Sequence, residues 1–423
     1  MIHAARYNAP FSDNSPLIVK QILLINAAGA DQPGVTSAIA QVLSRYQAAI
    51  LDIGQAVIHD NLTLGMMVGV DTADIKESEL LAELQSATVD LGIDIRFTPV
   101  SHASYQQWVE HQGKARYIVT LLAREVTAGQ IADLTQITVK HGLNIDNISR
   151  LSGRVPLDGL ATKSNACVEF SVRGEPADRE ALRRDFMELS TRHEADVAFQ
   201  RDTVYRRNRR LVCFDMDSTL IEAEVIDELA KAAGVGEQVA EITEQAMSGE
   251  LDFNQSFAAR MALLKGLDES VLAEIAENLP VTEGAAKLIS SLKKLGYKTA
   301  ILSGGFQYFG EYLQKKLGID YVYANTLDIV DGKVTGEVKG EVVNGERKAA
   351  LLKMLAEREG ITAEQTIAVG DGANDLPMLA AAGLGIAFRA KPLVKASAEQ
   401  AISTLGLDAI LYLLGFRERD QIL

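Results

Sequence analysis

Residues 211–220 read Leu-Val-Cys-Phe-Asp-Met-Asp-Ser-Thr-Leu, and this stretch decides the fold of the second half of the chain. Its first four residues form an apolar run of strand length, which predicts a buried parallel strand. The run ends in two carboxylates, Asp215 and Asp217. Open α/β sheets bind ligands at the carboxyl ends of such strands. Because crowded anions at a low-dielectric edge are unfavourable, the pair indicates a bound divalent cation and phosphate chemistry.

The sequence after Leu211 alternates strands with helices, which predicts a parallel sheet. The expected strands are 211–214, 298–302, 321–324, 366–369 and 385–388. The helical stretch 226–279 is too long for a single crossover helix, so we interpret it as an inserted cap. Two turn signals, Asp331-Gly332 and Asn344-Gly345, predict one antiparallel excursion.

Upstream of this region, one pattern of strands and helices occurs twice. Residues 18–100 predict the order β-α-β-β-α-β of a ferredoxin-like α+β module, and residues 115–202 follow the same order. The basic run that follows them is interpreted as a solvated linker, because charge runs at domain boundaries usually are. It comprises Arg206, Arg207, Arg209 and Arg210.

Bulk composition narrows the range of partners and compartments. The 42 basic and 57 acidic residues give a net charge of −15, which argues against nucleic acid and anionic membranes as partners. Two cysteines in 423 residues, Cys167 and Cys213, fit a reducing compartment. The first fifteen residues lack a secretory pattern, and the longest apolar stretch, 379–388, is too short to span a membrane. We therefore expect a cytoplasmic protein.

Further polar groups suited to phosphate follow other predicted strands. Ser303 and Gly304 come directly after the strand 298–302, and a hydroxyl with backbone amides can hold phosphate oxygens. Lys348 opens a predicted helix, and it matters only if the fold aims it at the same edge. Each signal alone is weak, because Ser-Gly-Gly is an ordinary loop and a lone lysine is usually solvated.

The segment Gly370-Asp371-Gly-Ala-Asn374-Asp375 follows the strand 366–369. Its carboxylate and amide oxygens are ligands that suit Mg²⁺. An Asx-turn with helix caps explains this segment equally well when it is taken alone.

The order of the four motifs, Asp-x-Asp-x-Thr, Ser-Gly, Lys and Gly-Asp-Gly-x-Asn-Asp, resembles the haloacid dehalogenase-like phosphatase superfamily. The helical cap directly after Asp-x-Asp-Ser-Thr resembles the phosphoserine phosphatases within it. The two upstream modules resemble ACT domains, which sense amino acids. This resemblance implies an α/β fold: a Rossmann-like parallel-sheet phosphatase core with an inserted helical cap, preceded by two ACT-type modules. The implied domains are 18–100, 115–202 and 208–423, with the cap at about 222–282.

The activity implied by the resemblance is Mg²⁺-dependent hydrolysis of O-phospho-L-serine, the last step of L-serine biosynthesis. One alternative is a superfamily phosphatase or phosphotransferase acting on another small phosphomonoester, such as phosphohomoserine or phosphothreonine. A second alternative is an ACT-type amino-acid-binding regulator with a relic catalytic half. The intact acidic cluster argues against a relic, because such a cluster is unfavourable without a use.

The resemblance assigns catalysis to three residues. Asp215 would attack phosphorus and form an aspartyl-phosphate, and as an ionised carboxylate it needs no separate base. Asp217 would protonate the leaving serine oxygen and then deprotonate the attacking water. Lys348, together with Mg²⁺, would cancel the repulsion between Asp215 and the phosphate. In an extended segment the two aspartates would point the same way, unless the chain turns directly after Asp215, as it does in family members.

The implied metal ligands are Asp215, Asp371 and the backbone carbonyl of Asp217, and Asp375 would orient them from behind. The residues implied around the phosphate are Ser303, Gly304, Lys348 and Asn374.

Substrate choice is expected to come from the cap. Glu224 matches the acidic residue that meets the substrate ammonium, and Arg260 matches the arginine that pairs with its carboxylate. Met247 and Phe253 match the apolar residues that close over the site. Each assignment has an alternative. Glu224 could simply stabilise a helix start through the helix dipole, Arg260 could be a surface arginine, and Met247 and Phe253 could be ordinary helix-packing residues.

The ACT-type modules imply amino-acid regulation and a homodimer. L-serine would bind near Asp31 or Gly34 in the turn Asp31-Gln-Pro-Gly34-Val, or near the corresponding Gly129 of the second module. The second module lacks the Asp-x-Pro-Gly form. The alternative is that the modules only dimerise.

Overall fold

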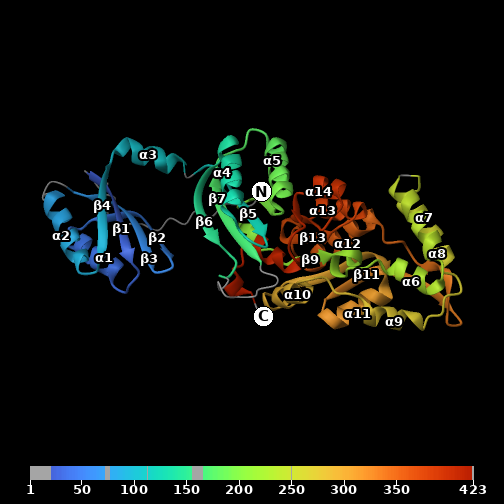
Figure 1. Cartoon of the computed structure of the whole chain (residues 1–423). Coiled ribbons are helices and arrows are strands. Elements are labelled where there is room, and N and C mark those ends of the chain that lie inside the picture. Colours follow the sequence, from blue (N-terminus) through green and yellow to red (C-terminus); the bar gives the residue numbers. More distant parts are fainter. Residues whose placement is uncertain (1–20, 72–76, 112, 155–164, 249, 422–423) are drawn as a thin grey trace, which may run out of the picture. The chain divides into compact units, whose positions relative to one another are not determined.

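The computed structural model describes residues 21–71, 77–111, 113–154, 165–248 and 250–421 (Figure 1). The chain divides into two compact units, residues 1–114 and 115–423. Within the described ranges, no helix combines the length and apolar character needed to cross a membrane.

Unit 1 contains the first ferredoxin-like module, as predicted. Its elements are β1 (Gln21–Ala30), α1 (Val35–Arg45), β2 (Ala49–Ile58), β3 (Asn61–Val70), α2 (Glu77–Val89) and β4 (Ile93–Val100), and the sheet order is β2-β3-β1-β4. Alternate β3 residues Leu62, Leu64 and Met66 are buried beneath the helices, as the period of a half-buried strand requires. A further helix, α3 (His102–His111), was not predicted, because its polar sequence carries no apolar period.

The second module begins unit 2 and repeats the same order. Its elements are β5 (Arg116–Ala123), α4 (Ala128–Lys140), β6 (Asn144–Arg150), β7 (Ala166–Arg173), α5 (Arg179–His193) and β8 (Asp196–Arg201), with sheet order β6-β7-β5-β8. Seven of the eight β5 residues are buried, because both faces of this sheet are covered. Val119 and Leu121 pack under α4 and α5, whereas Leu122 belongs to the core of the phosphatase-like region.

That region is built on a seven-stranded sheet of order β12-β11-β10-β9-β13-β14-β15. The strands are β9 (Leu211–Phe214), β10 (Lys298–Phe306), β11 (Tyr321–Val330), β12 (Lys333–Lys339), β13 (Thr366–Gly370), β14 (Leu384–Phe388) and β15 (Gln400–Ile402). All neighbouring strands are parallel except the β11–β12 hairpin, which turns at Asp331-Gly332 as predicted. The predicted parallel sheet is therefore confirmed, with β9 at its centre.

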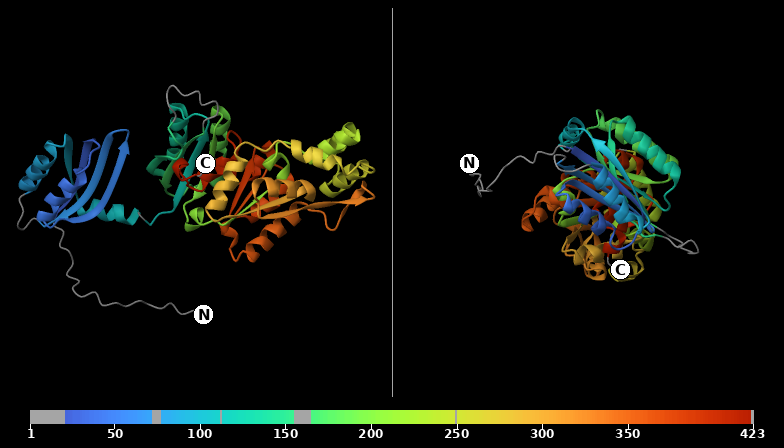
Figure 2. Two further views of the ribbon diagram at one scale, coloured as in Figure 1. Left: turned by 90° about the horizontal axis from the view of Figure 1, so that it is seen from below. Right: turned by 90° about the vertical axis from the view of Figure 1, so that its left-hand side faces the viewer.

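Two layers of helices enclose this sheet (Figure 2). Val212 and Phe214 of β9 face α10 (Ala285–Lys294) and α11 (Gln307–Leu317). Leu211 and Cys213 face the opposite layer. That layer contains α12 (Gly345–Arg358), α13 (Leu376–Ala381) and α14 (Pro392–Ser397), and α15 (Ile410–Leu413) follows near the end of the chain. Burial of β9 on both faces explains its unbroken apolar run.

The predicted helical cap lies between β9 and β10. It consists of α6 (Val225–Ala233), α7 (Gly236–Met247), α8 (Phe253–Leu263) and α9 (Val271–Asn278). Its two connections to the core run side by side: the Glu222 amide donates to the Pro280 carbonyl (2.9 Å), and the Thr282 amide donates to the Leu220 carbonyl (3.0 Å). We call residues 220–222 and 280–282 the cap hinge.

One sequence interpretation was wrong, and a second was wrong in part. Asn344-Gly345 is not a hairpin turn: the Asn344 side chain caps α12 by accepting from the Arg347 amide (3.0 Å), a role that asparagine fills as readily as a turn. The arginine run is a solvated linker only in part, because Arg207 and Arg210 are exposed but the other two arginines are not. Arg206 and Arg209 are buried between the second module and the core, where Arg206 pairs with Glu169.

Candidate active site

The chain turns sharply at the end of β9, and this turn separates the two aspartates. The Asp215 carboxylate accepts from the Met216 amide (2.8 Å), and residues 216–220 then form a single helical turn. Ser218 in this turn adopts a left-handed backbone with φ of 54°, which is unfavourable for a residue with a side chain. Asp217 Oδ1 consequently points to the Val225 amide (2.9 Å) rather than alongside Asp215. The exception foreseen for a turning chain therefore applies.

Lys348 lies at the centre of the acidic cluster. Its Nζ is 2.8 Å from Asp215 Oδ1 and 2.7 Å from Asp375 Oδ1, and its side chain is 0% exposed. Helix α12 carries it there, because the Asn344 cap starts the helix one turn earlier. Asp375 is fixed in turn by the Gly372 amide, which donates to its Oδ2 (2.9 Å). The fold thus aims this lysine at the edge where β9 and β13 end.

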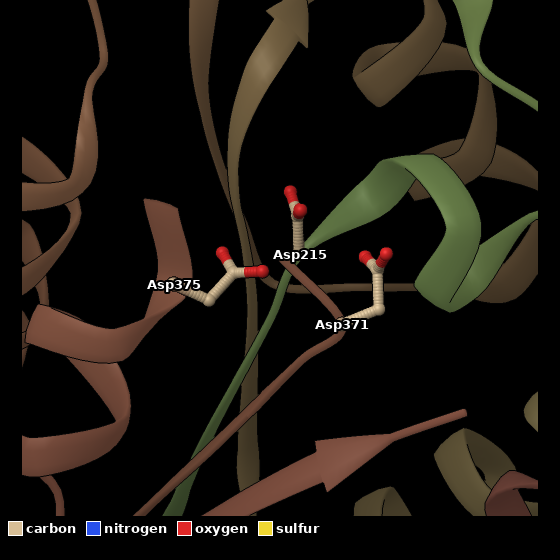
Figure 3. Close-up of side chains that lie close together, drawn as sticks. All are labelled: Asp215, Asp371 and Asp375. Carbon is tan, nitrogen blue, oxygen red and sulfur yellow. The ribbon is translucent and has the colours of Figure 1, made fainter. Parts of the chain in front are cut away.

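Three carboxylates converge at this edge (Figure 3). Asp215, Asp371 and Asp375 offer oxygens that all lie within 4.8 Å of one another. Thr219 donates to Asp371 Oδ1 (3.3 Å), so a hydroxyl from the turn after β9 helps to orient it. If all three were ionised, their three negative charges against the single charge of Lys348 would leave two uncompensated.

The pKa values of Asp215 and Asp371 reflect both the burial of the cluster and its excess of negative charge. Burial, followed by the neighbouring charge of Asp375, raises the pKa of Asp215 to about 8. Burial and Asp375 likewise raise the pKa of Asp371 to about 7. Burial acts to lower the pKa of Lys348, but Asp215 and Asp375 outweigh it and the pKa is raised. Buried oxygen ligands that lack a full complement of positive charge fit a hard divalent cation.

Asp217 and Glu224 form a second acidic pair beside this cluster. Burial, then Glu224 and Asp215, raises the pKa of Asp217 well above its usual range, which favours its protonated form. Glu224 immediately precedes α6 and accepts from Ser218 Oγ (2.7 Å). Burial raises its pKa as well. A carboxyl that holds a proton near neutral pH can serve as a general acid.

The expected loop 303–305 belongs to the C-terminal end of β10, and this strand end approaches Asp217 closely. Ser303 is fully buried and its Oγ accepts from the Gly305 amide (2.9 Å). A side chain at Gly305 would overlap Asp217 Oδ2, so only glycine permits this approach. Sequence reasoning missed Asn325, whose Nδ2 donates to the Gly304 carbonyl (2.7 Å) and whose Oδ1 accepts from the Val343 amide (2.9 Å). Asn325 directly follows the expected strand 321–324, a position where polar residues also followed the other predicted strands.

The cap contacts this end of β10 through Phe253. A Cβ built on Gly304 would lie 3.1 Å from Phe253 Cζ, so the ring covers the glycine. Arg260 lies about two turns further along α8 and is partly buried. Burial lowers its pKa, although the nearby charges of Glu224, Asp227 and Asp217 act to raise it. Met247 ends α7, and its side chain lies outside the described residues.

Four predicted residues remain: Asn374, Asp31, Gly34 and Gly129. Asn374 lies in the short turn Ala373–Asp375, next to Gly372. Asp31 and Gly34 belong to unit 1, where Gly34 (φ 102°) precedes α1 without a side-chain cap. Gly129 lies in the first turn of α4, whose start is closed by a capping box between Thr127 and Gln130.

Fold and site together define a haloacid dehalogenase-like hydrolase. That family model matches residues 209–383, and ACT domain models match residues 21–98 and 115–200. A phosphoserine phosphatase of Streptomyces coelicolor is 40% identical over 94% of this chain and 93% of its own length, and one of Mycobacterium tuberculosis is 39% identical over the same shares. The chain therefore belongs to the phosphoserine phosphatase family.

Solved structures agree with this assignment. An unliganded probable phosphoserine phosphatase of Vibrio cholerae superposes with a TM-score of 0.56 at 40% identity, over 71% of this chain and 86% of that one. A haloacid dehalogenase family hydrolase of Salmonella enterica gives 0.60 at 33% identity, over 70% and 98%.

Proposed function

We propose that this protein hydrolyses O-phospho-L-serine to L-serine and phosphate through an aspartyl-phosphate on Asp215, the last step of L-serine biosynthesis. The observation that carries the proposal is the buried Lys348 ammonium held against Asp215, with Asp217 two residues further along the turn after β9. This arrangement supplies a nucleophile, a positive charge to reduce its repulsion from phosphate, and a proton donor.

In this proposal Asp215 attacks phosphorus while Asp217 gives its proton to the departing serine oxygen. Asp217 then removes a proton from the water that hydrolyses the aspartyl-phosphate, because the same group must act as acid and base in the two half-reactions. Ser303 Oγ and the Gly304 amide hold phosphate oxygens. Asn325 supports them by fixing the Gly304 carbonyl and hence the plane of the Gly304 peptide at the end of β10.

Mg²⁺ is the proposed metal. Its ligands would be Asp215, Asp371 and the Asp217 carbonyl, and Asp375 and Asn374 would orient these ligands. When bound, it would neutralise negative charge on the phosphate and on the cluster. The two uncompensated charges and the raised pKa values of Asp215 and Asp371 support a divalent cation at this place.

The cap supplies the proposed specificity. A free phospho-amino acid carries an ammonium and a carboxylate, and the cap side of the cluster offers Glu224 for the first and Arg260 for the second. Arg260 is partly buried, so its charge is screened less than at an open surface, whereas Glu224 lies exposed beside the cluster. Phe253 covers Gly304 and would exclude water during transfer. Met247 is assigned the same covering role.

The first ACT module is the proposed site of an L-serine effector. Its helix α1 begins at Gly34 without a side-chain cap, whereas the α4 start near Gly129 is occupied by the Thr127–Gln130 box. We therefore favour Asp31 and Gly34 over Gly129. A homodimer through this module is supported by exposed apolar side chains on the edge strand β2, namely Ile50, Ile53 and Ile58.

Steady-state phosphate release tests these proposals together. We expect turnover of phosphoserine that requires Mg²⁺, exceeds turnover of phosphohomoserine and phosphothreonine, and changes on addition of L-serine. Higher activity on either of the other phospho-amino acids would demote phosphoserine. Sedimentation measurements on the wild-type chain and an Ile53→Lys variant test the dimer, which the lysine should weaken.

A further inference from the structure

Four charged side chains connect the second ACT module to the cap hinge through consecutive ion pairs. Arg124, which directly follows β5, forms a two-pronged pair with Glu283: Nη1 to Oε1 is 2.9 Å and Nη2 to Oε2 is 2.8 Å. Arg389 then reaches Glu283 Oε2 through Nη2 (3.2 Å) and Glu222 Oε1 through Nη1 (2.8 Å). All four lie in unit 2, and we call them the hinge network.

The two acids of the network lie at the two connections between cap and core. Glu222 is the last residue of the outgoing connection, and Glu283 directly follows the returning one. Arg389 therefore joins both connections from the end of β14. Its backbone is left-handed, with φ of 45°, so the fold maintains an unfavourable conformation where this side chain bridges them.

The network is strongest at the contact with the module. Side chains of Arg124 and Glu283 are 34% and 25% exposed, and two-pronged arginine–carboxylate pairs of this kind are both strong and directional. Asn165 of the same module accepts from Arg124 (3.2 Å) and donates to Asp408 of the core (3.1 Å). The outer end is weaker, because Glu222 is 50% exposed and solvent screens its charge.

The hinge is joined to the catalytic turn over a few residues. The Ser218 amide donates to the Ala223 carbonyl (3.2 Å), and Ser218 Oγ donates to Glu224. Ala223 and Glu224 directly follow Glu222, and their hydrogen bonds to Ser218 hold the turn that contains Asp217. A shift of Glu222 would therefore displace Glu224 and disturb this turn.

We infer that Arg124, Glu283 and Arg389 are positioning residues, through which the second ACT module sets the orientation of the cap hinge and thereby of Glu224. In the first module the residue directly after the corresponding strand β1 is Asp31. The same position in the second module thus contacts the phosphatase core. The second module is a coupling element, and a displacement of its β5–α4 loop is transmitted to the cap. This inference rests on the proposed phosphoserine activity.

The test compares Arg124→Met with Arg192→Met in the full-length chain. Arg192 is the matched control, because its pair with Asp133 (2.9 Å) lies within the second module. Hydrogen–deuterium exchange follows the hinge amides of Glu222 and Thr282, and kinetics compare phosphoserine with p-nitrophenyl phosphate, which lacks the ammonium and carboxylate. We expect faster hinge exchange in Arg124→Met and about tenfold lower kcat/KM for phosphoserine, about 1.4 kcal/mol, with the aryl phosphate changed less than about twofold.

Two further variants keep the result interpretable. Arg124→Lys keeps the positive charge but cannot form the two-pronged pair with Glu283. Its hinge exchange and its kcat/KM should lie between those of wild type and Arg124→Met. Glu222→Gln removes only the half-exposed end, so it should fold and shift exchange and kinetics in the same direction. Matching exchange and kinetics in Arg124→Met and Arg192→Met would overturn the inference, as would equal losses on both substrates. Absence of wild-type phosphoserine turnover would instead refute the proposed function, while hinge exchange would still test the network.

Discussion

Replacing Lys348 by methionine removes the only cation in direct contact with Asp215 and Asp375 among the described residues, while keeping a side chain of similar length. At separations of 2.8 and 2.7 Å, each Coulomb attraction is about 6 kcal/mol at an effective dielectric constant of about 20. Desolvation of the charges offsets much of this. Removing one partner of a buried ion pair typically lowers the unfolding free energy by about 3–5 kcal/mol, which we expect here.

Scanning calorimetry of the EDTA-treated chain measures this loss. At about 2 °C per kcal/mol for a unit of this size, the unit 2 transition should fall by roughly 6–10 °C. The loss should be larger at pH 9 than at pH 6, because Asp215 takes up a proton at the lower pH and relieves its uncompensated charge. Phosphoserine turnover should fall by at least about 10²-fold, since a charge aimed at the reacting group is lost.

The matched control is Lys353→Met, an exposed lysine on the same helix, which should change neither property. Adding Asp375→Asn to Lys348→Met should recover part of the lost unfolding free energy. One of the two carboxylates that lost their ion-pair partner is then replaced by a neutral amide. Equal stabilities for Lys348→Met and wild type in EDTA at pH 9 would refute the reasoning, as would near-wild-type turnover.

Four other outcomes are expected. Asp215→Asn should abolish turnover at unchanged circular dichroism, and a variant of near-wild-type rate would exclude Asp215 as nucleophile. Arg260→Ala should raise KM for phosphoserine by about 10²-fold and barely affect p-nitrophenyl phosphate, if it pairs with the carboxylate; equal losses would assign it a different role. The raised pKa values of Asp215 (about 8) and Asp371 (about 7) mean that the folded metal-free chain binds more protons than the unfolded chain. Its stability should therefore fall as pH rises from about 4 to about 8, and saturating Mg²⁺ should abolish the fall; a flat profile in EDTA would contradict the charge assignment. Asn325→Ala should lower kcat about tenfold by releasing the Gly304 carbonyl, and an unchanged kcat would remove Asn325 from the site.

Much of the fold could be predicted because local patterns were unambiguous. The alternation of β3 and the continuous apolar run of β9 follow directly from one-sided and two-sided burial. Where local chemistry fits two structures equally, the prediction failed. Asn344-Gly345 suits a tight turn or a helix cap, and only the packing of α12 selects the cap.

The arginine run failed for a different reason. Charge patterning assumes that a charged segment remains in water, whereas the second module and the core close around Arg206 and Arg209. The burial of Lys348, in contrast, had a local signal. It occupies the same helical stripe as Leu351, Leu352 and Leu355, which predicts that this lysine faces the core.

The sequence by itself determined the order of the motifs, the repeated module and the kind of chemistry that closely spaced carboxylates allow. These depend on residue type and spacing along the chain. Only the tertiary structure decided that Asp217 turns away from Asp215, that Lys348 bridges Asp215 and Asp375, and that Arg124 pairs with Glu283 across 159 residues. Such contacts depend on where separate elements bring their side chains, and that is fixed by packing between segments far apart in sequence.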